Sequence, residues 1–224
     1  MTNISLIGFV AIGRNEGERL KRCLRSLRQE SDSVVYVDSG STDGSVEFAK
    51  SIAVEVLALD TSATFTMSRA RNAGWKLLVE KWPTLEFIQL VDGDCELIEG
   101  WVPAATAFLA ANPQVAAVCG RRRERFPEKS IFNRLCETEW NTPVGEAKAC
   151  GGDSLMRRSA LEEVAGYNED LIAGGVRRRA GGLRPLAEDG VLTILAKLPR
   201  YLGIQKYRKD HQWSRAAKII EYKS

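Results

Sequence analysis

Short apolar runs alternate along the first half of the chain with stretches in which apolar residues recur every three or four positions. The short runs predict strands, and the spaced positions predict amphipathic helices. Expected strands cover residues 4–12, 33–37, 54–59, 87–91 and 115–120, and expected helices cover 16–28, 46–53, 67–82 and 101–111. This alternation predicts an α/β fold with a mostly parallel sheet flanked by helices.

The second half of the chain has a weaker pattern. Residues 131–140 and 186–198 predict helices, and residues 147–156 predict a strand broken by two glycines. Ser159 and Glu162 have the spacing of a capping box, which predicts a short helix that ends at Gly166. Residues 174–184 are rich in Gly and Arg without apolar periodicity, so we expect a loop there.

Polar residues follow three of the expected strands, after Ile12, Val37 and Val91. In a parallel sheet these strand ends meet at one edge, where open α/β sheets bind ligands. Asp92 and Asp94 flank Gly93 at the third of these ends. Clustered carboxylates repel one another, and a bound divalent cation commonly offsets that cost. An Asp-Gly hairpin turn is the alternative explanation for this segment taken alone.

Composition narrows the class of protein. A chain of 224 residues with 44% hydrophobic and 27% charged residues suits one globular domain, and the net charge of +3 does not argue for nucleic acid. Five scattered cysteines favour a reducing compartment over a disulfide framework. The start of the sequence does not have the pattern of a signal peptide, and no apolar run approaches the roughly 18 residues that span a bilayer. We therefore expect a cytoplasmic protein.

Four segments together resemble the family 2 nucleotide-sugar glycosyltransferases, which have the Rossmann-like GT-A fold. They are residues 10–16 (VAIGRNE), 37–45 (VDSGSTDGS), 69–74 (RARNAG) and 91–94 (VDGD), and the resemblance extends over residues 4–167. It implies one GT-A domain over residues 1–224. Residues 1–120 would form the half that binds a nucleotide sugar, 121–198 the acceptor half, and 199–224 a basic tail.

The resemblance also implies roles for residues of the donor half. Ile12 and Gly13 would help to form the floor under the nucleotide base. Asn15 and Glu16 would lie beside the nucleotide, although capping of the following helix explains them equally well. Asp38 would accept a hydrogen bond from uracil, with a turn and helix cap as the alternative.

The arginines and carboxylates would hold the phosphates. Arg71 would be the donor-site arginine, with Arg69 less clearly involved, because guanidinium groups at a helix start favour a phosphate or a nucleobase carbonyl. A surface charge pair is the alternative. Asp92 and Asp94 match the D-x-D element of the family. Asp92 would reach the donor and the metal, and Asp94 would bind Mn²⁺ or Mg²⁺. Cys95 is interpreted as a packing residue.

The acceptor half departs from the family pattern. Gly152 and Asp153 would contact the sugar, with a turn role for Asp153 as the alternative. The expected acidic pair is missing after Gly174. The next pair, Glu188 and Asp189, is therefore the candidate for the general base, with Asp189 first, Glu188 second and Asp170 third; first-turn acids of a helix are the alternative.

His211, the one histidine, could complete the metal site or be incidental. The basic, aromatic tail could rest on the inner face of a membrane, pack under the sheet or bind a polar-lipid acceptor.

Two functions from different classes remain open. The first is a metal-dependent, inverting glycosyltransferase that moves a sugar from a UDP or GDP donor to the hydroxyl of a saccharide or polar lipid. The second is a catalytically impaired protein that binds nucleotide sugars, which the missing acidic pair suggests. A dinucleotide-dependent oxidoreductase is disfavoured because the first strand is not followed by G-x-G-x-x-G.

Overall fold

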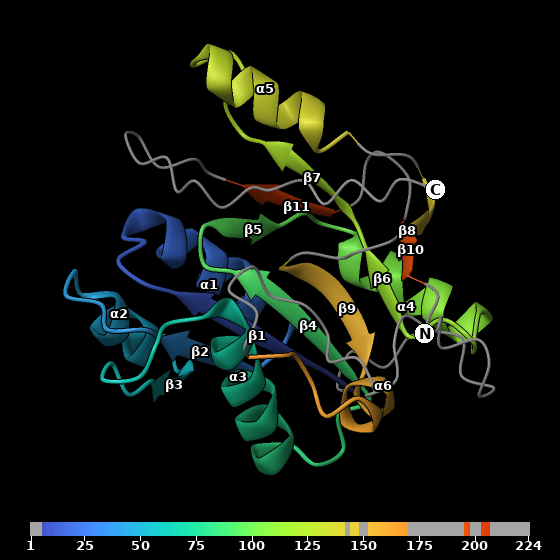
Figure 1. The fold of residues 1–224 in the computed structure, drawn as a ribbon, viewed down its shortest axis with the longest axis horizontal. Helices are drawn as coiled ribbons and strands as arrows, with labels where there is room; N and C mark the ends of the chain where they lie inside the picture. Colours follow the sequence, from blue (N-terminus) through green and yellow to red (C-terminus); the bar gives the residue numbers. More distant parts are fainter. Residues whose placement is uncertain (1–5, 142–143, 148–151, 170–194, 198–202, 207–224) are drawn as a thin grey trace.

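The computed structural model describes residues 6–141, 144–147, 152–169, 195–197 and 203–206 (Figure 1). The helices are α1 (Glu18–Glu30), α2 (Ser45–Ser51), α3 (Met67–Lys81), α4 (Trp101–Ala111), α5 (Ile131–Glu139) and α6 (Arg158–Glu163). The strands are β1 (Ile7–Gly13), β2 (Val34–Asp38), β3 (Glu55–Ala58), β4 (Phe87–Asp92), β5 (Cys95–Leu97), β6 (Ala117–Cys119), β7 (Arg121–Glu124), β8 (Gly145–Ala147), β9 (Asp153–Arg157), β10 (Leu195–Lys197) and β11 (Gly203–Lys206).

An eight-stranded sheet forms the centre, in the order β3-β2-β1-β4-β9-β6-β10-β8. Its first four strands are parallel to one another, and β9 runs antiparallel to both β4 and β6. The parallel part follows from the strand–helix alternation of the first 92 residues, because a helix must return the chain to the same end of the sheet. The predicted α/β fold is confirmed.

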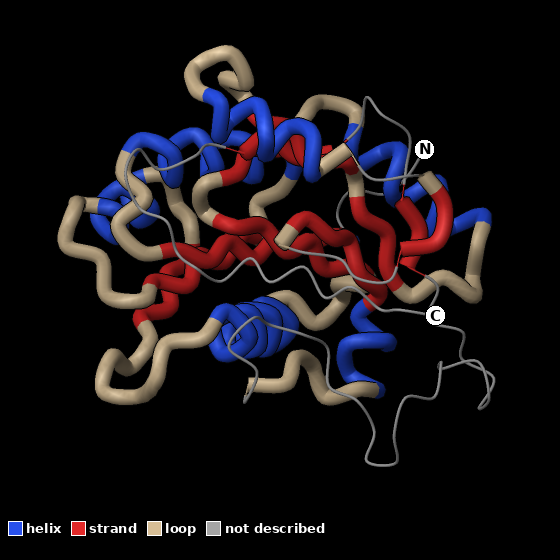
Figure 2. The backbone as a smooth tube through the Cα atoms, turned by 45° about the horizontal axis from the view of Figure 1, so that its top comes forward, coloured by secondary structure: helices blue, strands red, loops and turns tan. Residues whose placement is uncertain are grey.

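Helices cover both faces of this sheet (Figure 2). Apolar residues of α1, α2 and α4 pack on one face, in a core that includes Leu24, Ala49 and Trp101. Residues of α3 and α6 pack on the other face, in a core that includes Leu78 and Leu161. All of β2 and all of β1 except Gly13 are buried between these helices, as expected for a parallel sheet whose two faces are covered.

Gly74 brings α3 close to the sheet. A Cβ atom at this position would overlap the side chain of Val10 and would lie 2.8 Å from Cγ2 of Val37. The helix that carries Arg71 therefore lies directly on β1 and β2, and Gly74 makes this close approach possible.

A second, smaller sheet has the order β5-β11-β7, with α5 beside it (Figure 1). The strand β11 is parallel to β7 and antiparallel to β5. The sequence pattern did not predict β5, β7 or β11, since each has only three or four residues and two of them are largely polar.

Two local predictions are wrong. Residues 195–197, expected in a helix, form strand β10, which pairs with β6 and β8. The helix α6 has Arg157 at its N-cap position without a side-chain cap, so Ser159 does not form the expected capping box. Residues 195–197 form a strand because they pair with β6 and β8. The helix α6 begins directly after β9, so Ser159 already lies inside the helix and not at its N-cap.

Candidate functional site

Three strand ends meet at one edge of the large sheet, as the sequence predicts. Ile12 pairs with both Val37 and Asp92, and Gly13 pairs with Asp38. The amide of Gly93 donates a hydrogen bond of 2.7 Å to the carbonyl oxygen of Ile12. A Cβ atom at Gly93 would lie 2.9 Å from that oxygen, so the loop after β4 needs glycine to lie this close to β1.

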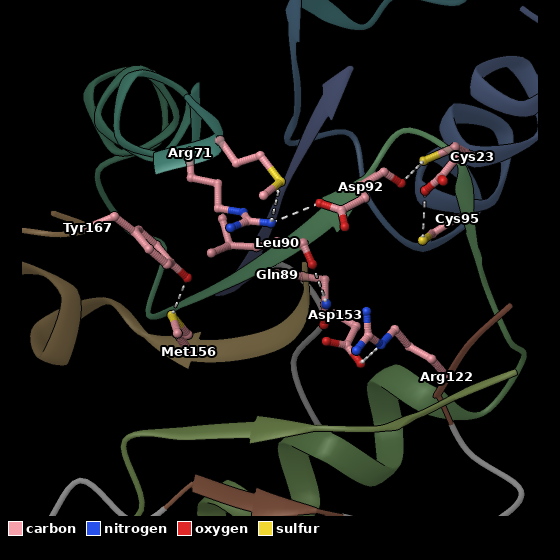
Figure 3. A network of polar contacts seen from close by, with 12 residues as sticks. Cys23, Arg71, Gln89, Leu90, Asp92, Cys95, Arg122, Asp153, Met156 and Tyr167 are labelled. Carbon is pink, nitrogen blue, oxygen red and sulfur yellow. Dashed lines mark hydrogen bonds and ion pairs between the residues drawn. The ribbon is translucent and has the colours of Figure 1, made fainter. Parts of the chain in front are cut away.

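Arg71 and Asp92 form an ion pair at the centre of this edge (Figure 3). Nη2 of Arg71 lies 2.9 Å from Oδ1 of Asp92, and the two side chains are 7% and 19% exposed. Burial would lower the pKa of Arg71, but the charge of Asp92 and its hydrogen bond, together with Tyr167 and Asp153, outweigh it, and the pKa is raised. The guanidinium also lies 5.6 Å from the ring centre of Tyr167. Arg71 is thus a fixed positive charge beside the acidic loop.

The loop after β4 gathers three possible metal ligands. One ligand atom each from Asp92, Asp94 and Cys95 lies within 4.8 Å of the others. The pKa of the Cys23 thiol beside this loop is raised well above its ordinary value, first by burial and then by the charges of Asp94 and Asp92. The loop therefore creates a negative field that suits a divalent cation.

The backbone at Gly152 leaves room for the Asp92 side chain. The amide of Asp92 donates to the carbonyl oxygen of Gly152 at 3.1 Å. A Cβ atom at Gly152 would overlap the carboxylate of Asp92. Only glycine fits here without moving that carboxylate. The carboxylate and thiol donors of the loop are of the kinds that hold divalent cations, so the residues present fit such an ion. Gly152 acts on Asp92, a contact that the sequence did not indicate.

Asp38 shapes the turn after β2. It is 3% exposed, and its carboxylate accepts hydrogen bonds from the Tyr36 hydroxyl at 2.8 Å and from the amides of Gly40 and Ser41 at 2.9 and 3.0 Å. Burial raises the pKa of the Tyr36 phenol, so Tyr36 stays a hydrogen-bond donor. Asp38 thus has the turn role given above as the alternative, while its contact with uracil remains a prediction.

The loops after β1 and β2 are joined by polar contacts. The side-chain Oδ1 of Asn15 accepts a hydrogen bond from the backbone amide of Thr42 at 2.7 Å. The backbone amide of Asn15 donates to Ser41 Oγ at 3.0 Å. Asp43 accepts from the amide of Gly17 at 2.8 Å. The N-cap of α1 is Gly17 without a side-chain cap, so capping by Asn15 or Glu16 is not what these residues do. Glu16 instead pairs with Arg19 at 2.6 Å.

A depression of about 330 Å³ opens beside these loops, and one of its lining residues, Ser39, directly follows Asp38. Its lining includes Arg14, Ser39, Asp60 and Arg69. Arg69 therefore faces a different space from Arg71, which is nearly buried at the ion pair. No role was expected for Arg14 and only an uncertain one for Arg69, although both belong to the quoted motifs.

Asp153 is the first residue of β9 and pairs with Val91. It is 3% exposed, and Nε of Arg122 lies 3.7 Å from its Oδ2 (Figure 3). The turn role given as an alternative for Asp153 is wrong, because the residue lies in a strand. Its expected contact with sugar stays a prediction. Arg122 was missed, since β7 was not predicted.

Asn72 is a further residue without an expected role. It is 2% exposed, and its Nδ2 donates to the carbonyl of Tyr167 at 2.9 Å and to Oε1 of Glu169 at 2.7 Å. Its Oδ1 accepts from the amide of Tyr167 at 2.8 Å. The helix that carries Arg71 is thus fixed to the turn at 166–169. A polar residue buried next to an arginine is the signal that could have identified it.

The remaining candidates, Glu188, Asp189, Asp170 and His211, lie outside the described residues. The same holds for most of the basic tail. In the part of the chain that the structure describes, no helix is both long and apolar enough to cross a membrane.

The fold is similar to solved glycosyltransferases. The structure of residues 1–349 of S. aureus TarS with UDP-GlcNAc matches at a TM-score of 0.63 and 14% identity, covering 95% of this chain and 61% of that one. The mannosyltransferase PcManGT from Pyrobaculum calidifontis, with GDP-Man and Mn²⁺, matches at 0.53 and 20%, covering 74% and 48%. These similarities show the GT-A fold.

Sequence comparison gives the family. A TPR repeat-containing protein of Synechococcus elongatus is 29% identical over 206 residues, and the match covers 77% of this chain and 49% of that protein. The chain thus spans about half the length of this relative. The model of "Glycosyl transferase family 2" matches residues 10–165, which include the loops and the ion pair described above. Since that match spans more than half of the sequence, the chain belongs to glycosyl transferase family 2.

Proposed function

We propose that this chain transfers a glycosyl group from a nucleotide-diphosphate sugar to the hydroxyl of an acceptor. One observation carries the proposal: the buried pair of Arg71 and Asp92 lies beside Asp94 at the edge where three parallel strands end. This places a positive charge and a cation-binding loop together, as recognition of a diphosphate requires. Family membership and the GT-A fold support the same activity.

The donor would lie along this edge. Asp38 and the depression lined by Arg14 and Arg69 lie beside the loops after β1 and β2, where we place the base. Arg71 and the loop at 92–94 would face the diphosphate. The similar structures hold UDP-GlcNAc in one case and GDP-Man with Mn²⁺ in the other, so we propose a UDP or GDP sugar and a divalent metal.

Asp92 and Asp94 would hold that metal, Mn²⁺ or Mg²⁺. When bound, such an ion neutralises charge on the departing diphosphate. Arg71 orients Asp92 and adds a second positive charge that does not depend on metal. Gly152 leaves space for the carboxylate, and Asp153 lies next to it on β9, where it would face the transferred sugar.

Transfer with inversion requires a base that takes the proton of the acceptor hydroxyl as that oxygen attacks the anomeric carbon. We propose Asp189 for this role, with Glu188 next in order. The acceptor would be a saccharide or a polar lipid, reached from the cytoplasm or from the inner face of a membrane. The second candidate, a protein that binds the donor without transfer, is motivated by the sequence after Gly174, which lacks the acidic pair of the family.

Nucleotide-sugar binding can be tested by thermal unfolding with UDP, GDP, CDP and dTDP sugars, with and without Mn²⁺. We expect one nucleotide class to stabilise the chain, by about 2.7 kcal/mol when the ligand is at 100 times its Kd. Asp94→Asn should remove the effect of Mn²⁺. Asp32→Asn, which changes a 92% exposed side chain, is the control. Stabilisation by no nucleotide sugar would contradict the proposal.

Catalysis is tested separately. Asp189→Asn should abolish transfer and leave donor binding unchanged, and unchanged turnover would exclude Asp189 as the base. Binding of the donor by the unmodified chain, without transfer or hydrolysis at any acceptor tested, would favour the binding protein. The configuration of the product at the anomeric carbon decides whether transfer is inverting.

A further inference from the structure

The acidic loop contains a sulfur atom in addition to its carboxylates. Cys95 follows Asp94 directly, and its side chain is in the hydrophobic core with 1% exposure. Its Sγ donates a hydrogen bond to Oδ1 of Asp94 at 3.3 Å. It also lies within 4.8 Å of the ligand atoms of both Asp92 and Asp94. We propose that Cys95 is the third protein ligand of the metal and gives the site a preference for thiophilic divalent ions over Mg²⁺.

The backbone fixes this sulfur on the inner side of the loop. Cys95 begins β5 and pairs with Lys206 of β11. Two residues later, the amide of Leu97 donates to Ser26 Oγ on α1 at 3.1 Å. The carboxylates approach the same point from the more exposed side, with Asp92 19% exposed. The sulfur already lies 3.3 Å from Oδ1 of Asp94, so a cation held by that carboxylate would lie close to it.

The chemistry of the three atoms predicts the preference. Carboxylates alone suit hard ions such as Mg²⁺ and Mn²⁺, whereas a thiolate favours Zn²⁺, Co²⁺ and Cd²⁺. On coordination the thiol proton passes to solvent, and the hydrogen bond to Asp94 is replaced by a shared bond to the cation. This inference rests on the proposed donor-site metal and adds the identity of its ligand.

Packing explains the same cysteine without any metal. Cys95 would then fill the core between α1 and β5 and only orient Asp94 through its hydrogen bond. The two explanations differ in one observable: only a ligand forms a sulfur–metal bond. The test therefore needs a spectroscopic signature of that bond, independent of enzyme activity.

Co²⁺ is a suitable probe because thiolate coordination produces a sulfur-to-cobalt charge-transfer band in the near ultraviolet. We expect this band in the unmodified chain and its loss in Cys95→Ser. The matched control is Cys23→Ser, which changes a buried thiol of α1 that donates to the carbonyl oxygen of Asp92 at 3.8 Å. That control should keep the band.

Relative affinity gives a second measurement. Cys95→Ser should weaken Cd²⁺ binding by at least about tenfold and leave the Kd for Mg²⁺ within about twofold. If Cys95→Ser fails to fold, the ¹¹³Cd chemical shift of the unmodified chain still reports whether sulfur is bound. A shift typical of oxygen ligands alone would overturn the proposal.

The outcomes separate this inference from the proposed function. Suppose that Co²⁺ binds to the unmodified chain without a charge-transfer band and that Asp94→Asn abolishes this binding. The metal would then be held by carboxylates alone, and Cys95 would be excluded as a ligand. A band that persists in Cys95→Ser would assign it to another thiol and exclude Cys95 as well. Failure of Co²⁺, Cd²⁺ and Mn²⁺ to bind at all would overturn both the inference and the metal dependence of the proposed function.

Discussion

Asn72 and Tyr167 exchange two hydrogen bonds across 95 positions of the sequence. The side-chain amide of Asn72 pairs with the backbone amide and carbonyl of Tyr167 much as a neighbouring strand would. The ring of Tyr167 in turn lies under the guanidinium of Arg71. The turn at 166–169 therefore helps to fix the arginine that we place at the diphosphate.

Replacement of Asn72 should weaken both stability and donor binding. Asn72→Ala leaves the backbone groups of Tyr167 and Nε1 of Trp75 without this partner, and each buried polar group left unsatisfied costs about 1–3 kcal/mol. Urea unfolding should show the loss of stability, and titration with the donor should show a higher Kd. Asn112→Ala is the control, because that amide caps α4 away from the site. Equal effects of the two variants on the donor Kd would refute a positioning role for Asn72.

The ion pair at the sheet edge predicts strong coupling between its partners. Arg71→Met removes the positive charge that faces Asp92 and should destabilise the chain by about 3 kcal/mol, since breaking a largely buried pair is costly. Adding Asp92→Asn should restore part of that loss. A double-mutant cycle by urea unfolding should give a coupling energy of about 1–3 kcal/mol.

The reference for this cycle is the Arg158–Glu162 pair on α6, in which the glutamate side chain is 46% exposed. That pair should couple by only about 0.3–0.5 kcal/mol. A coupling of similar size in the two cycles would mean that the Arg71–Asp92 pair is not specially stabilised.

Gly152 predicts an effect on metal affinity. In Gly152→Ala the new methyl group would overlap the carboxylate of Asp92, so that carboxylate must move. We expect the Kd for Mn²⁺ to rise about tenfold or more, as happens when a metal ligand loses its orientation. Isothermal titration measures this change.

Gly44→Ala is the matched control for the alanine. Gly44 has a φ of +81°, and its added Cβ would meet nothing within 4 Å. That variant should lose stability of about 1 kcal/mol through backbone strain and keep the Kd for Mn²⁺. An unchanged Kd in both variants would mean that Asp92 is not held by Gly152.

The contact between Asp43 and Gly17 predicts a pH dependence. Burial would raise the pKa of Asp43, but hydrogen bonds from Ser45 and from the amide of Gly17 outweigh it, and the pKa is lowered from 3.8. A lowered pKa in the folded state stabilises the chain above pH 3.8, and this stabilisation is lost as pH falls below that value. Asp43→Asn should be less stable than the unmodified chain at pH 7.

The difference between the two proteins should shrink as pH falls below 3.8, where Asp43 of the unfolded chain becomes protonated, and should disappear below the lower pKa of Asp43 in the folded chain. Thermal unfolding at several pH values measures it. Asp60→Asn also removes an exposed carboxylate with a lowered pKa, and it shows how much of the effect is general. Among the described residues, Asp60 accepts hydrogen bonds only from Ser62 in its own loop. A difference that is constant from pH 3 to pH 7 would contradict the assignment to Asp43.

The parallel half of the fold was predictable because its signals are local. Strands such as β1 and β4 are buried runs between amphipathic helices, and chain order then places Asp38 and Asp92 at one edge. The cluster at this edge was likewise predictable from the motifs. In contrast, β5, β7 and β11 depend on partners far away in the sequence, so three or four residues carry no signal of their own.

The sequence indicated which residues belong to the site better than it indicated the contacts that these residues make. Asp38 was identified, but its bonds to Tyr36 and to the turn could not be derived from spacing. The proximity of Gly152 to Asp92 depends on antiparallel pairing of β9 with β4, which the sequence does not specify. Cys95 was assigned to packing, and only the structure shows its sulfur next to both carboxylates.

The position of β11 has a consequence for synthesis of the chain. Because β11 lies between β5 and β7, these two strands have no partner in the small sheet until residues 203–206 have left the ribosome. A nascent or prematurely terminated chain that stops before residue 203 would expose two unpaired strand edges next to the loop at 92–95. Such edges favour pairing with other chains, so truncated products should aggregate rather than accumulate in a folded state.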